Sequence, residues 1–476
     1  MAHAFVNNIF SKWQTTPEED VVINSATSAR PKQYWHIPGY QTGSWDGYVK
    51  FYNQRSKTLP TGLVAEATAA LEAAGFPASI TIQTDYECPP RIGATLNYEI
   101  ESGHQLRVLE AMLAHKRGII HAATNAGKTK IAQAWCALHQ VRVLYLVPSK
   151  ELLKQTVESF QRDTNLDVGW ISAEEGWRAG KDVTVCLVSS VARRKNRAGK
   201  VANQKVVDRF QEIAATFQAV IVDECHHLSA ETWRWVLKAL KNANYRYGLS
   251  GSPWQHGDPA EALRVKALLG PVIATVTNEE LIAKGWSAKP VISMIDVPSQ
   301  FPLKLDDYSE VYEAGIVSST LRNSMIVEIC RTFQEQEKTC LVVSTRIAHC
   351  EILSDMLKVA GVEHRVVIGQ TEKDSRKQDL VDFRERKFPI LISNVLSEGV
   401  DIPSLNGLVF SSGGKSSKQM LQRVGRGVRK KLTGKNEVEI YDFIDNSHSY
   451  LLKHTLERVE LYHREGFEVN QATIKF

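Results

Sequence analysis

Three short groups of residues in this chain have the types and spacing that phosphoryl transfer requires. The first is "GKT" at 127–129, which follows an apolar "GII" and precedes a helical pattern, so it falls on a turn between a strand and a helix. Backbone N–H groups at such a turn bind phosphate oxygens, the lysine reaches the β- and γ-phosphates, and the threonine hydroxyl ligates Mg²⁺. Residues 121–130 therefore predict an ATP–Mg²⁺ site held by Lys128 and Thr129. The strict pattern has glycine where this chain has Ala122, so a solvated turn is the alternative.

The second group is "AVIVDECHH" at 219–227, an apolar strand that ends in two adjacent carboxylates. Asp223 is placed to hold Mg²⁺, and Glu224 is placed to polarise the attacking water. His226 is interpreted as a hydrogen-bonding residue that couples to the carboxylates, because no partner for a metal site lies near it in the sequence. An acidic strand end without function is the alternative. It is weakened by the phosphate-loop pattern that precedes the strand.

The third group is "QRVGRGVR" at 422–429, where Arg426 and Arg429 stand three residues apart. On a helix this spacing places both side chains on one face. Two guanidinium groups on one face can stabilise the charge that spreads over the γ-phosphate oxygens during transfer. A basic patch for nucleic acid is the alternative, and Lys430 and Lys431 fit only a solvated face.

These residues must be positioned by buried strands, and the sequence contains two series of them. Apolar runs that alternate with helix-length segments predict parallel sheets covered by helices. The runs are 141–147, 183–188, 219–222 and 247–250, and then 340–344, 365–369, 389–393, 407–411 and 438–444. We expect α/β domains at 91–285 and 286–476, linked through the polar, proline-containing stretch 286–312. Residues 1–90 contain one clear helical pattern at 65–75 and predict a small α+β domain.

The bulk composition describes a globular chain of 476 residues with a net charge of +5, which is compatible with a nucleic-acid partner. Seven scattered cysteines form no metal-binding pattern and predict buried thiols in a reducing compartment. No signal peptide and no apolar run of ~18 residues is present. We therefore expect a cytoplasmic protein without a membrane segment, in the host cytoplasm if a phage encodes it.

Taken in order, these motifs resemble those of the superfamily 2 helicases of the DEAD/DExH-box group, which implies two RecA-like domains in tandem. The family's first motif has a glycine where this chain has Asn125, and asparagine tolerates left-handed backbone angles better than most residues. The resemblance implies that ATP is bound by residues of both domains, and that Ser250 and Ser252 of "LSGSP" couple hydrolysis to movement. The implied nucleotide contacts are Gln105, Thr124, Asn125, Ala126, Gly127, Lys128 and Thr129, with Gly399 and Asp401 of "LISNVLSEGVDIP" and Gln422.

The resemblance also implies where a nucleic-acid strand is gripped. "VPSKEL" at 147–152 matches one strand-contacting motif, and "LVSSV" at 187–191 stands where a second belongs. The run "RRKNRAGK" at 193–200 carries five cations, and we expect either contacts to the DNA backbone or a solvated loop. The candidates for contact are Pro148, Ser149, Lys150, Ser190, Arg193 and Arg194.

Residues 30–57 combine five basic residues and one acidic residue with seven aromatic rings. Cations that follow a backbone and rings that stack on bases suit DNA, with Lys50, Arg55 and Lys57 as candidates. The alternative is a small aromatic core, which is the prediction for most of the rings. The stretch 35–64, with "WDG" and then "PTGL", resembles the N-terminal domain of the phage UvsW-type recombination helicases.

This resemblance covers nearly the whole chain and implies a monomeric, ATP-dependent DNA helicase. The expected substrates are branched or duplex DNA, through migration of Holliday junctions and regression or unwinding of forks. The expected processes are recombination, repair and replication, with single-strand-binding or recombination proteins as possible partners. Three alternatives remain: an RNA helicase with the same core, the motor part of a restriction or repair nuclease, and a DNA-binding or annealing protein without catalysis.

Overall fold

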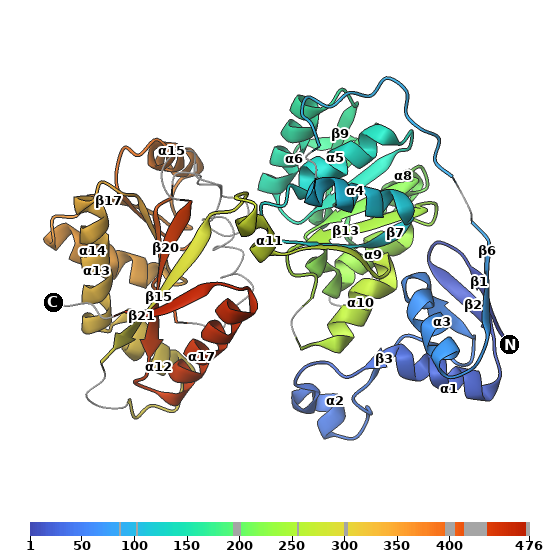
Figure 1. Cartoon of the computed structure of the whole chain (residues 1–476), viewed down its shortest axis with the longest axis horizontal. Helices are drawn as coiled ribbons and strands as arrows, with labels where there is room; N and C mark the ends of the chain where they lie inside the picture. The colour runs from blue at the N-terminus through green and yellow to red at the C-terminus, as the bar shows by residue number, and fades with distance from the viewer. Residues whose placement is uncertain are drawn as a thin grey trace. The chain divides into compact units, whose positions relative to one another are not determined.

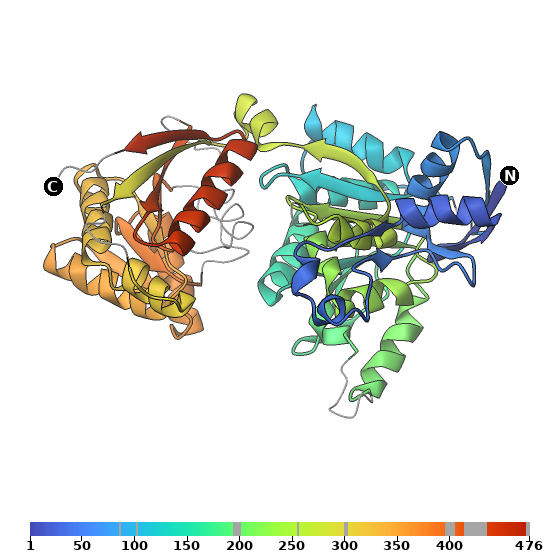
Figure 2. The ribbon, with the colours of Figure 1, turned by 90° about the horizontal axis from the view of Figure 1, so that it is seen from below.

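The computed structural model describes residues 1–84, 87–100, 103–193, 201–254, 257–298, 303–395, 405–413 and 436–472. The chain divides into two compact units, Met1–Val276 and Thr277–Phe476. The first unit contains a four-stranded and an eight-stranded sheet, and the second contains a seven-stranded sheet. Helices flank the large sheet of each unit (Figure 1; Figure 2 gives a second view).

The eight-stranded sheet of the first unit has the order β10-β9-β11-β8-β12-β13-β7-β14. All neighbours are parallel except β10 and β9. Its strands are β7 (Arg117–Ala122), β8 (Val143–Val147), β9 (Val168–Ser172), β10 (Gly176–Arg178), β11 (Val183–Leu187), β12 (Ala219–Asp223), β13 (Tyr245–Ser250) and β14 (Val272–Val276). Because parallel strands end at one edge, the residues after β7, β12 and β13 meet there.

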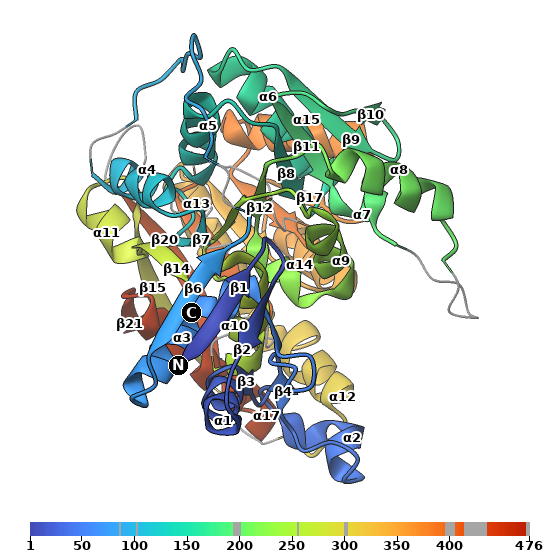
Figure 3. The same ribbon diagram turned by 90° about the vertical axis from the view of Figure 1, so that its right-hand side faces the viewer.

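Helices cover both faces of this sheet, as expected for strands that are apolar at every position. On one side lie α4 (His104–Ala114), α5 (Lys128–Leu138) and α6 (Lys150–Asp163). On the other lie α7 (Val188–Val191), α8 (Gln204–Ala214), α9 (Glu231–Ala239) and α10 (Pro259–Leu269) (Figure 3). Phe210, Trp233 and Leu237 from the second group form one core with the strands.

The N-terminal segment forms its own mixed sheet, β5-β2-β1-β6. The strands are β1 (Ala2–Val6), β2 (Phe10–Gln14), β5 (Thr58–Pro60) and β6 (Ala78–Ile82), and the main helices are α1 (Pro17–Ala26) and α3 (Val64–Ala73). Helix α3 confirms the helical pattern at 65–75. Trp13, Leu59 and Leu71 lie in a core that also includes Ala267 of α10, so this sheet is packed on the domain that carries the larger one.

A glycine makes that packing possible. Gly62 lies in the 3-10 helix η2 (Thr61–Leu63), and a Cβ atom there would be 1.9 Å from the carbonyl oxygen of Lys266. The Lys266 ammonium pairs with Glu66 at 3.1 Å. The "PTGL" motif therefore lies where the backbone of η2 contacts the backbone of α10.

The aromatic segment 30–57, which lies between β2 and β5 in the sequence, differs from the prediction. Of its seven rings only Tyr52 is buried, while Trp35 is 51% and Tyr48 40% exposed. The segment folds into η1 (Tyr34–His36), α2 (Pro38–Gln41) and the short pair β3 (Ser28–Ala29) and β4 (Val49–Lys50). The prediction of an aromatic core for most of the rings was wrong, because α1 and α3 already fill the core beneath the four-stranded sheet.

The second unit is built on a parallel sheet of order β17-β18-β16-β19-β20-β15-β21. Its strands are β15 (Lys289–Val297), β16 (Cys340–Val343), β17 (His364–Val367), β18 (Ile390–Ser393), β19 (Gly407–Phe410), β20 (Glu437–Asp445) and β21 (Glu468–Ala472). Helices α13 (Thr320–Glu335) and α14 (Ile347–Val359) supply one core, and α15 (Lys373–Arg384) and α17 (Ser449–Arg464) supply the other. Among the described residues of this unit, the other elements are α11 (Asn278–Ala283), α12 (Tyr308–Tyr312) and the π-helix η4 (Glu313–Val317).

The interpretation of 286–312 as a link was wrong, because nine of these residues form β15 inside the sheet. β15 pairs with β20 on one side and β21 on the other. Pro290 is tolerated because it lies at the start of the strand. The fold class is confirmed: two RecA-like parallel-sheet domains accompany a small α+β domain.

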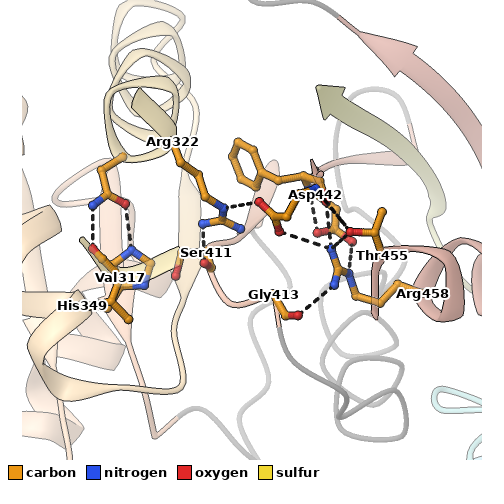
Figure 4. A network of polar contacts seen from close by, with 11 residues as sticks. Val317, Arg322, His349, Ser411, Gly413, Asp442, Thr455 and Arg458 are labelled. Atoms are coloured by element: carbon orange, nitrogen blue, oxygen red, sulfur yellow. Dashed lines mark hydrogen bonds and ion pairs between the residues drawn. The ribbon is translucent and has the colours of Figure 1, made fainter. Parts of the chain in front are cut away.

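A buried ionic network ties the second unit together (Figure 4). Arg322 of α13 bonds to Asp445 at 2.9 Å and to the backbone oxygen of Ser411. Arg458 of α17 bonds to Asp442 at 2.8 Å and to the oxygen of Gly413 at 3.2 Å. Both arginines are almost completely buried, so their charges must be paired. The network connects helices on the two faces of the sheet through the ends of β19 and β20.

Candidate active site

The phosphate loop spans residues 123–127, between the end of β7 and the start of α5. Two of its residues have left-handed backbone angles, Asn125 with φ 75° and Gly127 with φ 75°. Asparagine is one of the few residues that adopt this conformation readily, which explains how it replaces the family's glycine. A Cβ atom at Gly127 would lie 2.3 Å from Nε2 of Gln105, so the glycine lets the Gln105 amide lie against the loop.

Helix α4 supports the loop from its other side. His104 is buried, and its Nε2 lies 3.1 Å from the carbonyl oxygen of Ala126. Ala126 is buried, and Thr124 is partly exposed. The structure thus brings Gln105 and the loop residues together, although Gln105 precedes Lys128 by more than twenty positions.

The Lys128 side chain folds back over this loop. Its Nζ donates to the backbone oxygens of Ala122 at 3.1 Å and Ala123 at 3.3 Å. Burial raises the pKa of Asp223 and the positive charge of Lys128 opposes this rise, which places the ammonium near the carboxylate at the end of β12. A lysine held only by neutral carbonyls keeps its charge available for phosphate oxygens.

Asp223 and Glu224 mark the end of β12. Asp223 is 8% exposed, and burial raises its pKa to about 7, with the neighbouring Glu224 adding to the rise and Lys128 opposing it. Glu224 has φ 48° and ψ 55°, a left-handed conformation that is costly for a residue with a side chain. Its N–H donates to Oδ1 of Asp223 at 3.0 Å. This strained turn directs the carboxylates of Asp223 and Glu224 toward different neighbouring residues.

Tyr145 is a site residue that the sequence reasoning missed. It occupies the middle of β8, is completely buried, and lies close to Thr129 and Asp223. Burial, and then the charge of Asp223, raise the pKa of its hydroxyl well above the usual value. Nothing in an apolar strand distinguishes this ring from a core residue, so only the packing of β8 beside β12 reveals it.

Thr129 and Asp223 together present hydroxyl and carboxylate oxygens, the donor types that Mg²⁺ prefers. Mg²⁺ in nucleotide sites takes few protein ligands and completes its coordination with phosphate oxygens and water. The pair therefore fits a nucleotide-bound magnesium ion. Across the described part of the chain, no group of three or more His, Cys, Asp or Glu side chains forms a metal-binding arrangement.

Residues after β12 and β13 form a hydrogen-bonded cluster around Glu224. The Ser250 hydroxyl donates to Oε2 of Glu224 at 3.3 Å, and Nδ1 of His226 lies 3.3 Å from both atoms. The Ser252 N–H donates to the Ser250 hydroxyl at 3.1 Å. The structure therefore brings together Glu224 and the three residues predicted to couple hydrolysis to movement.

The predicted strand-contacting residues of the first unit lie after β8 and β11. Ser149 caps helix α6 by accepting from the N–H of Leu152, beside Pro148, and the exposed Lys150 pairs with Glu174. Ser190 is buried, and its hydroxyl accepts from the N–H of Ala173 at 2.9 Å. Ser190 is thus used in packing against the end of β9, and a strand contact at this position stays a prediction.

The three N-terminal candidates for DNA contact differ in their exposure and in their ion pairs. Arg55 is exposed, and Lys50 is exposed and pairs with the exposed Asp46. Lys57 is partly buried and pairs with the largely buried Asp20. Lys57 is therefore a structural cation, which corrects its interpretation as a DNA contact. Arg193 lies at the end of the described segment 103–193 and faces Glu231 at 3.9 Å.

Several predicted residues lie outside the described residues. They are Arg194, Gly399, Asp401, Gln422, Arg426 and Arg429.

The cysteines agree with the expectation of buried thiols. All seven are free, and all but Cys88 are buried. In the described ranges, no helix has the length and apolar character needed to cross a bilayer.

Comparison with known proteins assigns both large domains. Residues 99–255 match the family described as the res subunit of type III restriction enzymes, and residues 322–431 match the helicase conserved C-terminal domain. The chain is 24% identical to the ATP-dependent DNA helicase uvsW of Enterobacteria phage T4, with 93% of each chain aligned. It is 26% identical to the DNA 3′-5′ translocase XPB2 of Sulfurisphaera tokodaii, over 69% of this chain and 78% of the relative.

A solved structure shares the fold. The type ISP restriction-modification enzyme LlaBIII bound to DNA superposes with a TM-score of 0.58 at 16% identity, over 86% of this chain and 34% of that one. The two matched families divide the helicase core between the two units, and the first carries the phosphate loop and the Asp223–Glu224 pair in one site. The chain is an ATP-dependent helicase of superfamily 2, in the DExH-box group, and it is similar to the UvsW-type helicases.

Proposed function

We propose that this helicase acts on DNA, and on branched DNA in particular, by migrating junctions and by regressing or unwinding forks. The observation that carries this proposal is the exposed aromatic segment 30–57. Trp35 and Tyr48 are open to solvent, and the Arg30 guanidinium lies over the rings of Tyr34 and Tyr48, at 4.7 and 4.5 Å. Exposed rings with a cation between them suit stacking on bases and contact with phosphates.

The position of this segment adds to the argument. Its domain is joined to the ATP-binding domain through the close contact of Gly62 with α10 and through Arg117, which donates to the oxygen of Asn8 at 3.1 Å. A DNA branch point held at 30–57, where bases are unpaired, would therefore be held by the same compact unit that binds ATP. The phage T4 relative, which aligns over 93% of its length, is a DNA helicase by name.

The site residues suggest how hydrolysis proceeds. The backbone N–H groups of residues 123–127 and Lys128 hold the β- and γ-phosphates, and Glu224 orients the attacking water. Mg²⁺ held by Thr129 and Asp223 would neutralise charge on the phosphate oxygens. Ser250 and His226 touch Glu224, so a change in its charge or position on hydrolysis reaches β13 and the loop that follows it.

The test compares substrates and a matched pair of variants. We expect ATP- and Mg²⁺-dependent unwinding of forks and four-way junctions, with weaker activity on blunt duplex and on RNA. Trp35→Ala/Tyr48→Ala should lower junction unwinding at least ~10-fold, because base stacking contributes about 1–3 kcal/mol per base. Ile82→Ala, which changes an exposed apolar residue of the same domain, should not.

Two outcomes would favour the alternatives. Equal stimulation of ATP hydrolysis by duplex RNA would indicate an RNA helicase, because the motifs do not distinguish the 2′-hydroxyl. Cleavage of DNA by the full chain would indicate the motor of a nuclease, as in the restriction enzymes that share its fold.

A further inference from the structure

A cavity of about 970 Å³ lies between the N-terminal sheet and the helices α9 and α10. Both walls belong to the first unit, and Figure 3 shows the N-terminal strands beside α10. One wall is formed by apolar side chains of β2, β4 and β5 and their neighbours, including Phe10 and Phe51. The other wall comes from α9, α10 and Arg193, two residues after the end of α7. The segments are far apart in sequence, and only the fold places them together.

The cavity is strongly basic. Four cations line it, Arg193, Arg234, Lys238 and Arg264, against one carboxylate, Glu231. Glu231 lies 3.9 Å from Arg193. Arg234 donates to the backbone oxygen of Ser229 at 3.1 Å, and this neutral partner does not offset its positive charge. Four cations converging on one concave surface attract an anion with several charges.

The cavity also presents aromatic surface. Phe10 is 47% exposed, although it belongs to a strand, and Trp235 is partly buried with its ring 5.7 Å from that of Phe210. Phe10 therefore offers an exposed aromatic surface to a ligand in the cavity. Rings and cations on facing walls match the two parts of a nucleotide, the flat base and the charged phosphate.

The walls cannot separate easily. Leu59 of β5 and Ala267 of α10, which both line the cavity, belong to the same buried core. The close contact of Gly62 with Lys266 and Ala267 joins the same two parts of the chain. A preformed cavity of this size lies within the usual range for ligand pockets.

We propose that this cavity binds an unpaired strand of DNA, with phosphates on Arg193, Arg234, Lys238 and Arg264 and an unstacked base against Phe10. An unpaired strand fits better than a duplex, because paired bases do not expose their faces for stacking. Arg193, which lines the cavity, is itself one of the residues that the sequence predicts as a strand contact. The inference rests on the proposed function only in taking DNA as the substrate.

Charge reversal tests the cation half of the proposal. Lys238→Glu/Arg264→Glu should weaken binding of a fork with one unpaired arm at least ~10-fold. The slope of log affinity against log salt should fall by about 1.4, because each phosphate contact on a single strand contributes about 0.7. Binding of blunt duplex and DNA-independent ATP hydrolysis should stay within two-fold of the unmodified protein. Arg331→Glu/Lys358→Glu, at exposed positions of α13 and α14, makes the same change in net charge and is the control.

The aromatic half is tested without charge. Phe10→Ala should weaken fork binding several-fold and leave the salt slope unchanged, and its folding is checked by thermal unfolding. A photo-crosslinking amino acid at position 10 should label the unpaired arm of the fork and not the paired region.

Contrary outcomes are distinct. Unchanged fork affinity and salt slope in the charge-reversal variant, or labelling only of duplex, would overturn the cavity proposal. Competition by an acidic peptide, with none by an oligo-dT strand, would assign the cavity to a protein partner instead. If the unmodified protein fails to unwind branched DNA, the proposed function fails. Binding and labelling with oligo-dT still decide the cavity proposal in that case.

Discussion

The hydroxyl of Ser250 donates a hydrogen bond to the carboxylate of Glu224 across 3.3 Å. One residue ends β13 and the other follows β12, so the bond links two neighbouring strands at the edge where the phosphate loop lies. His226 contacts both groups through Nδ1. The residue that we expect to orient water is thus joined directly to the segment that we expect to transmit movement.

Removing this link should separate hydrolysis from unwinding. Ser250→Ala deletes the bond and leaves Glu224 and Lys128 in place, so ATP hydrolysis should stay within a few-fold of normal while duplex unwinding falls ~10-fold or more. Both rates are measured on the same fork substrate. Ser229→Ala removes an exposed hydroxyl that donates to the backbone oxygen of His226. This control variant should change neither rate. Equal loss of the two activities would place Ser250 in the chemical step.

Lys128→Ala should abolish ATP hydrolysis. The variant removes the only cation that the structure places over the phosphate loop among the described residues, while nucleic-acid binding should remain within about three-fold. The measurements are steady-state phosphate release and fluorescence anisotropy with labelled DNA. Lys130→Ala, on the exposed side of the same helix, is the matched control. Normal turnover in Lys128→Ala would contradict the nucleotide-site assignment.

Gly62→Ala should loosen the N-terminal domain from the ATP-binding domain. The added methyl would meet the Lys266 oxygen at 1.9 Å, and backbone on both sides limits relaxation. We expect a loss of about 1–3 kcal/mol in the free energy of unfolding, as for overpacked cores. Chemical denaturation measures it. Gly39→Ala, where the new atom would make an ordinary contact of 3.4 Å, should change stability little.

His349 predicts a pH dependence of stability in the second unit. Burial, and then the charge of Arg322, lower its pKa to about 3, and its Nε2 donates to Asn323 at 2.9 Å. The unfolded chain protonates this ring near pH 6.5 and the folded chain only near pH 3. Between these values the unfolded state binds more protons, so acidification destabilises the fold by up to about 1.4 kcal/mol per pH unit.

Replacing the ring isolates this effect. His349→Gln should reduce the dependence of the unfolding free energy on pH between about 6.5 and 4. His463→Gln, at an exposed position on α17, should leave it unchanged. Identical pH profiles for His349→Gln and the unmodified protein would show that the buried ring does not control acid sensitivity.

Local spacing in the sequence was sufficient for many of the buried strands. The apolar runs at 183–188, 340–344 and 438–444 became strands, because every residue in a two-sided parallel sheet is buried. The left-handed turn at Asn125 also followed from residue type. Both are properties of neighbouring residues, which a sequence states directly.

The tertiary structure decided what depends on segments far apart in the chain. The stretch 289–297 contains proline, serine and aspartate, so its pattern is equally compatible with a linker, and only pairing with β20 and β21 makes it a strand. Tyr145 joins Thr129 and Asp223 because β8 lies beside β12. Ser190 is used in packing, and Phe10 and Arg264 line opposite walls of one cavity. Such contacts arise from which surfaces pack together, and that choice is made by the whole core at once.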